Sequence, residues 1–139
     1  MRTSNTIKRS FSALAVTAAL GAAALLSAPA ASAAASNCPV KFACIWADSG
    51  WVTNGVGSYY VGFQRKIPNY ARWHYNSTSI SANDSASSLY NNGNLSTAMF
   101  YVNANRGGPA ISFPKKTGSV NLSINGVNDQ LSSGYFAGF

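Results

Sequence analysis

A six-residue phrase occurs twice in this 139-residue chain. The first copy, Asn83 to Ser88, reads Asn-Asp-Ser-Ala-Ser-Ser, and the second, Asn128 to Ser133, reads Asn-Asp-Gln-Leu-Ser-Ser. Both fit Asn-Asp-x-x-Ser-Ser, although the chain holds only three acidic residues. Two of these, Asp84 and Asp129, take the same place in the two copies. An internal repeat of oxygen-bearing side chains predicts a two-fold arrangement and suggests a pair of calcium sites.

The first 35 residues have the features of a secretory signal peptide. Three basic residues precede a mostly apolar run from Phe11 to Leu26, and small residues then offer cleavage after Ala33 or Ala35. The competing interpretation is a membrane anchor, but the run is shorter than the ~20 residues that span a bilayer. We therefore expect a cleaved signal, a secreted, extracellular protein without a membrane anchor, and one mature domain from residue 36 to residue 139.

The charge of the mature region is modest. Seven basic side chains against three acidic ones leave a net charge of +4. Nucleic-acid binding favours basic residues clustered on one element, whereas here they occur singly or as two adjacent pairs. We expect no nucleic-acid partner and a monomer the size of one ordinary domain. The basic residues are Lys41, Arg65, Lys66, Arg72, Arg106, Lys115 and Lys116.

Cys38 and Cys44 are the only cysteines. In an exported protein, two cysteines at this spacing favour a disulfide bond. Zinc is the alternative, but a structural zinc site needs four ligands and the chain has one histidine. The chain-entropy estimate for so small a loop is about 2 kcal/mol, so we expect the bond to pin the first strand rather than to hold the fold together.

Short apolar clusters separated by turn residues predict an all-β protein. Asn, Gly, Ser and Pro divide the clusters, as at Asn54-Gly55 and Asn125-Gly126, and this spacing is typical of a β-sandwich or barrel. The mature region shows no long amphipathic helical pattern. The clusters are Val40–Trp46, Tyr59–Phe63, Ala98–Val102, Ala110–Phe113, Val120–Ile124 and Leu131–Phe136.

The duplication extends outwards from the phrase. Trp46 and Tyr101 each lie in a predicted strand that ends in a polar turn, upstream of one copy. The interval from the aromatic residue to the phrase is 37 residues in the first half and 27 in the second. We place the additional residues of the first half between Ile67 and Ala82, a stretch rich in Pro, Asn, Ser and aromatics.

An aromatic residue followed by six residues and a Gly, and then by the Asn-Asp-x-x-Ser-Ser phrase, resembles the βγ-crystallin Greek-key motif. Tyr101 and Gly108 match it fully, and Trp46 matches it except that Thr53 replaces the Gly. With the signal peptide and the opening segment from Cys38, the chain resembles a secreted, actinobacterial-type peptidase-inhibitor family, whose characterised activity is inhibition of metalloproteinases. The resemblance implies a Greek-key β-sandwich of two repeats, about 38–92 and about 93–139.

Thr53 departs from the motif in a way that has a physical consequence. Gly at this position adopts positive φ without a Cβ clash, whereas a β-branched residue is strained there. We expect the first hairpin to be shaped differently, with Gly50 or Gly55 taking over the turn.

The resemblance also implies a ligand set for calcium. In a crystallin-type site, the Asn/Asp pair of one motif and the Ser/Thr of the other hold one ion, and backbone carbonyls near Ser49 and Ala104 would complete the shells. A single carboxylate in each site implies weak binding, on the order of 10⁻⁴ M, of up to two ions. The implied ligands are Asn83, Asp84 and Ser132 for one ion, and Asn128, Asp129 and Ser87 for the other.

The alternative is that these side chains only form turns. Asn, Asp and Ser also bond to nearby backbone groups and stabilise turns without an ion. We assign this role to Ser88 and Ser133, the last residue of each phrase.

A β-scaffold inhibitor presents a rigid segment to the protease cleft, and pre-organisation supplies much of the affinity. Two segments of this chain are candidates for this role, the segment from Arg106 to Ile111 and the aromatic stretch from Tyr70 to Tyr75. The family's known loop is braced by a second disulfide, and no cysteine follows Cys44, so no reactive residue can be carried over. For both segments, an ordinary loop or edge strand is the alternative. The first candidate inhibitory loop comprises Arg106, Gly107, Gly108, Pro109, Ala110 and Ile111.

The composition argues against an enzyme. The chain has no Glu and one His, His74, and acid–base catalysis needs paired titratable groups. The leading expectation is a secreted metalloproteinase inhibitor whose partner is a secreted protease. The alternative is a calcium-binding structural or surface-binding module, with a toxin-like role among its options, that inhibits nothing. Its surface patch would draw on Trp51, Tyr59, Tyr60, Trp73 and Tyr75.

Overall fold

The computed structural model describes residue 35 and residues 37–139. Apart from Ala35, the predicted signal peptide lies outside these residues, and its cleavage remains a prediction. Within the described part of the chain, no helix combines the length and the apolar character that a membrane crossing requires.

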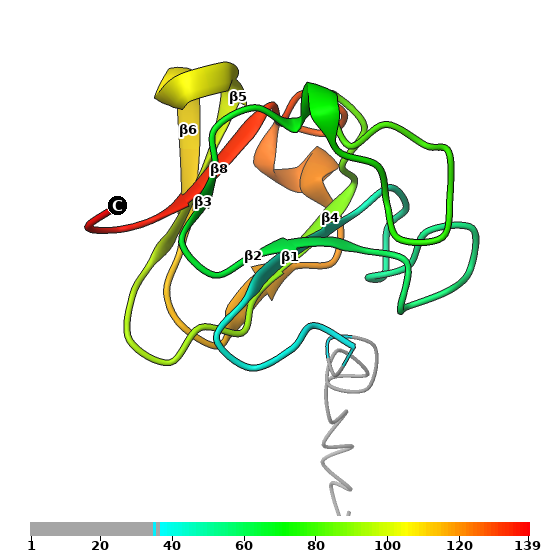
Figure 1. Cartoon of the computed structure of the whole chain (residues 1–139), viewed down its shortest axis with the longest axis horizontal. Helices are drawn as coiled ribbons and strands as arrows, with labels where there is room; N and C mark the ends of the chain where they lie inside the picture. The colour runs from blue at the N-terminus through cyan, green and yellow to red at the C-terminus, as the bar shows by residue number, and fades with distance from the viewer. Residues whose placement is uncertain (1–34, 36) are drawn as a thin grey trace, which may run out of the picture.

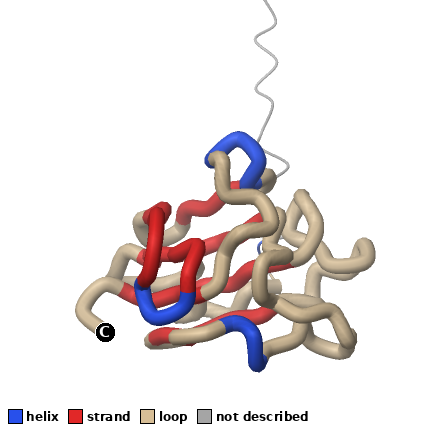
Figure 2. The backbone as a smooth tube through the Cα atoms, turned by 90° about the horizontal axis from the view of Figure 1, so that it is seen from above, coloured by secondary structure: helices blue, strands red, loops and turns tan. Residues whose placement is uncertain are grey.

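The strands form two four-stranded antiparallel sheets (Figure 1). The first has the order β2-β1-β4-β7, and the second has the order β3-β8-β5-β6. Figure 2 shows the strands gathered towards one side of the molecule and long loops on the other. The strands are β1 (Ala43–Trp46), β2 (Val61–Phe63), β3 (Lys66–Ile67), β4 (Ser88–Asn91), β5 (Ala98–Asn103), β6 (Gly107–Phe113), β7 (Thr117–Ser119) and β8 (Ser133–Phe136), and the 3₁₀ turns are η1 (Tyr70–Arg72), η2 (Ala104–Arg106) and η3 (Leu122–Asn125).

Each sheet takes three strands from one half of the chain and one strand from the other half. In the first sheet β7 pairs with β4, with Leu89 opposite Ser119. In the second sheet β3 pairs with β8, with Lys66 opposite Tyr135. If β1 to β4 of the first half are exchanged with β5 to β8 of the second half, the strand order of one sheet becomes that of the other. The predicted all-β sandwich of two repeats is therefore confirmed.

The main core lies between the sheets. Ile45 and Leu89 come from the first sheet and Phe100 from the second, and all three side chains are completely buried. The ring of Phe63 makes edge contacts with Phe100 and Phe136, at centroid distances of 5.8 and 5.6 Å. Burial of each of these large apolar side chains stabilises the fold by about 1.5–3 kcal/mol.

Strand β1 is buried on both faces, which explains why the sequence around it is apolar without alternation. Ala43 and Ile45 point into the main core. Cys44 and Trp46 point to the opposite face, where they form a second buried cluster with Trp51. The predicted disulfide bond is present: Cys38 and Cys44 are bridged with their Cα atoms 5.9 Å apart, and it covers the outer face of this strand.

The hairpin after β1 differs from its second-half counterpart, as predicted. Thr53 is fully buried, and its Oγ1 accepts a hydrogen bond from the Ala47 amide at 3.0 Å. It avoids the positive φ of Gly108, which is 70°. Instead, Asn54 and Gly55 have φ values of 52° and 74° and form a tight two-residue turn.

Additional residues of the first half form an irregular hairpin from Trp73 to Ala82. The Ala82 amide donates to the Trp73 carbonyl at 2.8 Å, and the Tyr75 amide donates to the Ile80 carbonyl at 3.1 Å. This hairpin lies where the sequence predicted the extra residues. The Asn76 amide donates to the Tyr60 carbonyl at 3.2 Å, so the hairpin lies beside the loop that precedes β2, both at the right of Figure 1.

Candidate functional site

Both repeated phrases lie at the same end of the sandwich. Trp46 is opposite Ser88 in the first sheet, and Tyr101 is opposite Ser133 in the second. The first phrase therefore leads into the start of β4 next to the end of β1, and the second leads into the start of β8 next to the end of β5. We call this the phrase end of the molecule.

The two phrases have the same backbone geometry. Asp84 and Asp129 have φ values of 52° and 54°, in the left-handed region that Asp tolerates better than most residues. The Asp84 amide donates to the Leu131 carbonyl at 3.1 Å, and the Asp129 amide donates to the Ala86 carbonyl at 3.0 Å. Each phrase is therefore bonded to the other by its backbone.

The side chains form two reciprocal clusters, each with members from both halves. Ser132 Oγ donates to Asp84 Oδ1 at 2.8 Å, and Ser87 Oγ donates to Asp129 Oδ1 at 3.2 Å. The structure thus brings together the two groups that the resemblance implied, Asn83, Asp84 and Ser132 in one cluster and Asn128, Asp129 and Ser87 in the other.

The Asn side chain of each cluster contacts the neighbouring carboxylate. Asn83 Nδ2 donates to Asp84 Oδ2 at 2.6 Å, and Asn128 Nδ2 donates to Asp129 Oδ2 at 2.7 Å. A half-turn of either amide would present its oxygen on the same side as the carboxylate. Carboxylate, hydroxyl and amide oxygens are the ligands that Ca²⁺ prefers, so the donor chemistry fits this ion.

Each cluster has one formal negative charge, and the described residues contain no group of three or more His, Cys, Asp or Glu side chains that could hold a metal. Such a donor set disfavours zinc and tightly bound transition metals. It fits a hard cation held mainly by neutral oxygens.

The last serine of each phrase is a structural residue. Ser88 Oγ donates to the Asp48 carbonyl at 2.6 Å and accepts from the Trp51 amide at 3.0 Å. Ser133 Oγ donates to the Asn103 carbonyl at 2.8 Å, and the Arg106 amide approaches it at 3.4 Å. Both hydroxyls therefore hold the hairpin that follows the first strand of their repeat, as the sequence predicted.

The third acidic residue also has a local role that the sequence did not reveal. Asp48 Oδ2 accepts a hydrogen bond from the Asn54 amide at 2.7 Å, which fixes the Asn54-Gly55 turn. In an Asx turn, the Asp side chain bonds to a backbone group two residues further along the chain. Asp48 and Asn54 are six positions apart, so this local pattern did not reveal the contact.

Most of the candidate inhibitory loop is a strand rather than a loop. Arg106 ends η2, and Gly107, Gly108, Pro109, Ala110 and Ile111 belong to β6, the edge strand of the second sheet. The edge strand was the alternative for this segment. The Arg106 guanidinium lies over the Tyr135 ring, with Cζ 4.3 Å from its centroid.

The aromatic residues considered for a surface patch do not form one. Trp51 and Tyr75 are buried in the two cores, and Tyr59 and Tyr60 are half-buried. Trp73, in contrast, is 46 % exposed. Aromatic composition alone does not distinguish core from surface, because aromatic side chains fill the cores of small domains and also occur at binding surfaces.

Comparisons with known proteins agree with this architecture. A scan against protein-family models finds no match, and no curated protein matches the chain. Among solved structures, one from work on the evolution of the eye lens βγ-crystallin domain fold is 16% identical, has a TM-score of 0.57, and is matched over 91% of its length and 73% of this chain.

Two further similar structures are a βγ-crystallin from Ciona intestinalis and one from an archaeon. They are 17% and 15% identical to this chain, each with a TM-score of 0.49 over 68% of it, and they are covered over 98% and 95% of their lengths. Nothing in the comparisons supports the expected membership of a peptidase-inhibitor family. The similarity to the first structure shows that this chain has the βγ-crystallin fold.

Proposed function

We propose that this protein is a calcium-binding βγ-crystallin-type module, in which each ion joins the phrase of one repeat to a serine of the other. The reciprocal Asp–Ser contacts carry this proposal. Ser132 Oγ and Asp84 Oδ1 are 2.8 Å apart although 48 residues separate them in the chain. The corresponding atoms of Ser87 and Asp129 are 3.2 Å apart.

The backbone supplies the pre-organisation that weak ligands need. The hydrogen bonds between the phrases position both Asp residues before any ion binds. An ion that enters such a cluster therefore meets its ligands at a reduced cost in conformational entropy. Ca²⁺ accepts six to eight oxygens in irregular geometry, whereas Mg²⁺ demands a near-ideal octahedron, so the clusters favour Ca²⁺.

The expected effect on stability follows from mass action. A site with a dissociation constant of about 10⁻⁴ M at about 1 mM free Ca²⁺ stabilises the folded state by about 1.4 kcal/mol. Two independent sites would contribute about twice this amount. In a domain of this size, each site corresponds to a rise in melting temperature of roughly 5–10 °C.

The module is proposed to be secreted and non-enzymatic. The chain lacks Glu, and its three Asp carboxylates all accept hydrogen bonds at the phrase end. Millimolar Ca²⁺ outside the cell would suit weak sites of this kind. Calcium would then keep the exported protein stable while its other surfaces meet a partner.

The test is a calcium titration of chelator-treated protein, by calorimetry and by thermal melting. Asp84→Ala should remove one site and Asp129→Ala the other, and the double variant should lose the calcium-dependent rise in melting temperature. Asp48→Asn is the matched control, because it removes the third acidic charge from the same end but keeps an oxygen for the Asn54 amide. Its calcium response should equal that of the wild type.

Two results would count against the proposal. A wild-type melting temperature that is the same with calcium and with chelator would mean that the phrases only form turns. Equal losses in Asp48→Asn and Asp84→Ala would mean that calcium is attracted by the general negative charge of this end rather than bound in the clusters.

A further inference from the structure

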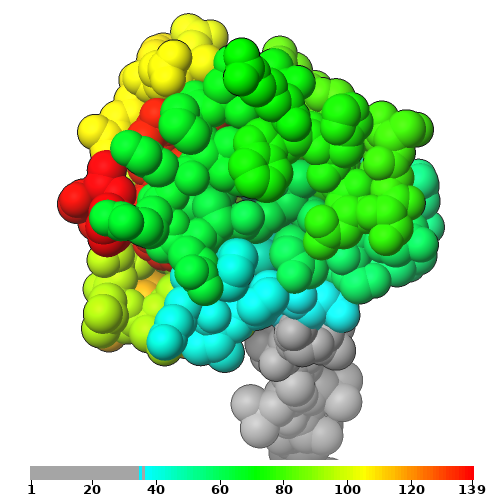
Figure 3. All heavy atoms as spheres, viewed as in Figure 1, coloured from blue at the N-terminus to red at the C-terminus, as the bar shows by residue number. Residues whose placement is uncertain are grey.

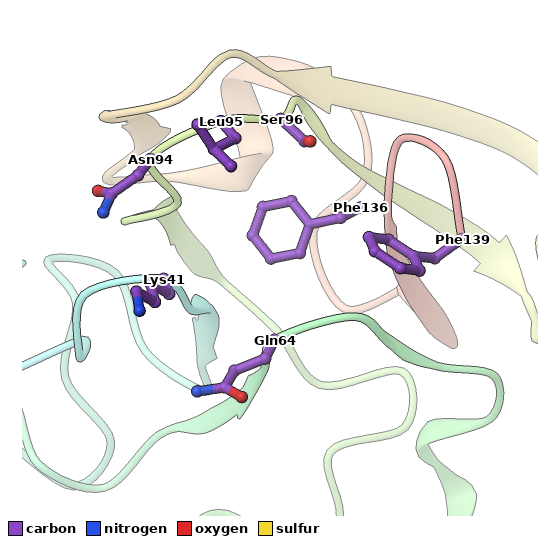
Figure 4. A pocket seen from close by; sticks show the side chains of 7 residues that line it. All are labelled: Lys41, Gln64, Asn94, Leu95, Ser96, Phe136 and Phe139. Carbon is purple, nitrogen blue, oxygen red and sulfur yellow. The ribbon is translucent and has the colours of Figure 1, made fainter.

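A hollow opens at the other end of the sandwich, away from the phrases. Its volume is about 340 Å³, and Figure 4 shows the Phe136 ring in the middle of the side chains that line it. Lys41 precedes β1, Phe136 ends β8 and Leu95 lies in the connection between β4 and β5. Since β1 and β5 begin here and β4 and β8 end here, the strand registers place this hollow opposite the phrase end.

The lining of the hollow is apolar and only partly covered. The floor is Phe136, which is 4% exposed and belongs to the main core. Leu95 is 92% exposed and Phe139 is 42% exposed. Among the large apolar side chains that the structure describes as exposed, Leu95 has the greatest exposed fraction. An apolar body that entered the hollow would cover Leu95 and Phe139 together.

The segment that carries Leu95 is held by buried hydrogen bonds. Asn91 is completely buried, and its Nδ2 donates to the carbonyls of Ser96 at 3.1 Å and Phe113 at 2.8 Å. Its Oδ1 accepts from the Gly93 amide at 2.8 Å. Two of these three hydrogen bonds join the Asn91 amide to the segment itself, at Gly93 and Ser96. The turn that exposes Leu95 to solvent is therefore stabilised by side-chain hydrogen bonds.

The backbone of Lys41, whose exposed side chain lines the rim of the hollow, is held in place. Lys41 has a φ of 75°, a conformation that is strained for a residue other than glycine or asparagine. Two constraints maintain it: the Lys41 amide donates to the Asn92 carbonyl at 3.0 Å, and the disulfide from Cys38 to Cys44 closes the loop that contains it. The disulfide therefore also sets the position of Lys41.

The charged side chains around the hollow are positive. No acidic side chain lines it, and the chain's three Asp residues belong to the phrases or to the turn after β1, at the opposite end. Arg65 adds a second cation, with Cζ 4.7 Å from the centre of the Phe139 ring. In Figure 3 the segment around residue 40 lies at the lower edge of the molecule, away from the hairpin around residue 105.

From the lining and the charge together, we propose that this hollow binds a small amphipathic anion, namely a carboxylate carried by a short aliphatic chain or a single aromatic ring. The apolar body lies on Phe136 between Leu95 and Phe139, and the carboxylate faces Lys41. The volume is near the lower limit of the about 300–1,000 Å³ typical of small-molecule sites, so the ligand is small. A ligand of this size binds with a dissociation constant on the order of 10⁻⁴ to 10⁻³ M.

The experiment is a titration of ¹⁵N-labelled protein with sodium octanoate, followed by NMR shifts of backbone amides. The shifts should be concentrated at Lys41, Leu95, Ser96 and Phe139 and should saturate. Octanol and octyltrimethylammonium carry the same chain without a charge or with the opposite charge, and both should bind more weakly. Shifts that do not saturate below about 10 mM octanoate, or that lie elsewhere, would overturn the proposal.

Variants separate the two parts of the site. Leu95→Ser should weaken octanoate binding by about tenfold, because it removes an exposed side chain that the ligand covers. Lys41→Gln should weaken it by up to about fivefold and remove its dependence on salt. The matched controls are Ile124→Ser, a similarly exposed apolar residue outside the hollow, and Arg72→Gln, an exposed cation in η1 near the phrase end. Both should bind octanoate as the wild type does.

The comparison among ligands and variants decides the outcome. Equal affinity for octanoate and octanol would contradict the role of Lys41. Equal weakening by Leu95→Ser and Ile124→Ser would mean that octanoate associates with any exposed apolar side chain. Calcium binding at the phrase end should be unchanged in the hollow variants, so failure of one proposal does not affect the other.

Discussion

Tyr70 carries a hydroxyl group that is buried in the main core without a hydrogen-bond partner among the described residues. The side chain is fully buried at the start of η1, and its Oη packs against Gly134, beside the ring of Phe63. Desolvation raises the pKa of Tyr70 well above its ordinary value, and the nearby Tyr75 and Tyr135 raise it further. The backbone groups of Tyr70 have hydrogen-bond partners: its amide donates to the Ser132 carbonyl at 2.8 Å, and its carbonyl accepts from the Trp73 amide at 2.8 Å. Only the hydroxyl is unsatisfied.

Replacement of this residue by phenylalanine should stabilise the protein. A buried, unsatisfied polar group costs about 1–3 kcal/mol, and removal of a single oxygen loses only part of that in packing. Tyr70→Phe should therefore raise the free energy of unfolding by about 1–2 kcal/mol. For a domain of this size the melting temperature should rise by roughly 4–16 °C. Urea denaturation and thermal melting, both in chelator to exclude any effect of calcium, measure the change.

Tyr75→Phe is the matched control, because the two tyrosines are equally buried but differ in one hydrogen bond. Tyr75 Oη lies 3.3 Å from Ser85 Oγ. Loss of this bond should lower the free energy of unfolding by about 0.5–1.5 kcal/mol. If Tyr70→Phe destabilises the protein as much as Tyr75→Phe does, the Tyr70 hydroxyl has a partner, and the reasoning from its isolation is refuted.

Three further predictions concern pH, the disulfide and inhibition. Burial raises the pKa values of Tyr70 and Tyr75 in the folded state, so the unfolded chain binds fewer protons above about pH 10 and stability should fall there by up to about 1.4 kcal/mol per pH unit for each tyrosine. Urea titrations at alkaline pH should show about half this slope in Tyr70→Phe, and an equal slope would contradict the assignment. Replacement of both Cys38 and Cys44 by Ser should cost about 2 kcal/mol in urea denaturation without loss of the fold, whereas an unfolded variant would show that the bond is essential. The inhibition expected from the family resemblance remains a prediction: the mature protein should inhibit a thermolysin-like metalloprotease in a panel that also contains serine proteases, and no inhibition at micromolar protein would exclude it.

The repeat was predictable from the sequence because it depends on a short, local pattern. The Asn-Asp-x-x-Ser-Ser phrase forms a turn with a left-handed Asp, and the resemblance to the crystallin motif implied which serine meets which carboxylate. The departure at Thr53 was predictable for the same reason, since a β-branched side chain excludes positive φ. Asn54-Gly55 is among the strongest local signals for a tight hairpin turn.

Long-range packing decided what the sequence did not show. The segment from Arg106 to Ile111 contains Gly-Gly-Pro, which is typical of a loop, but pairing with β5 draws it into an edge strand. Trp51 and Tyr75 were candidates for the surface, and packing places both in the interior. The hollow had no sequence signal at all, because Lys41, Leu95 and Phe136 meet only when both sheets are assembled.

The crossing of β3 and β7 into each other's sheets has a consequence for how such a protein originates. A chain of one repeat could complete a four-stranded sheet only by borrowing a strand from a second copy, so its folding would depend on protein concentration. Fusion of two copies replaces that encounter with an intramolecular one, at an effective concentration in the millimolar range. A fused chain also permits its two repeats to differ, and the hairpin from Trp73 to Ala82 is one such difference. The two phrases are constrained differently from this hairpin. Each Asp must still meet the serine of the other repeat, so a change in one phrase affects the contacts of the other.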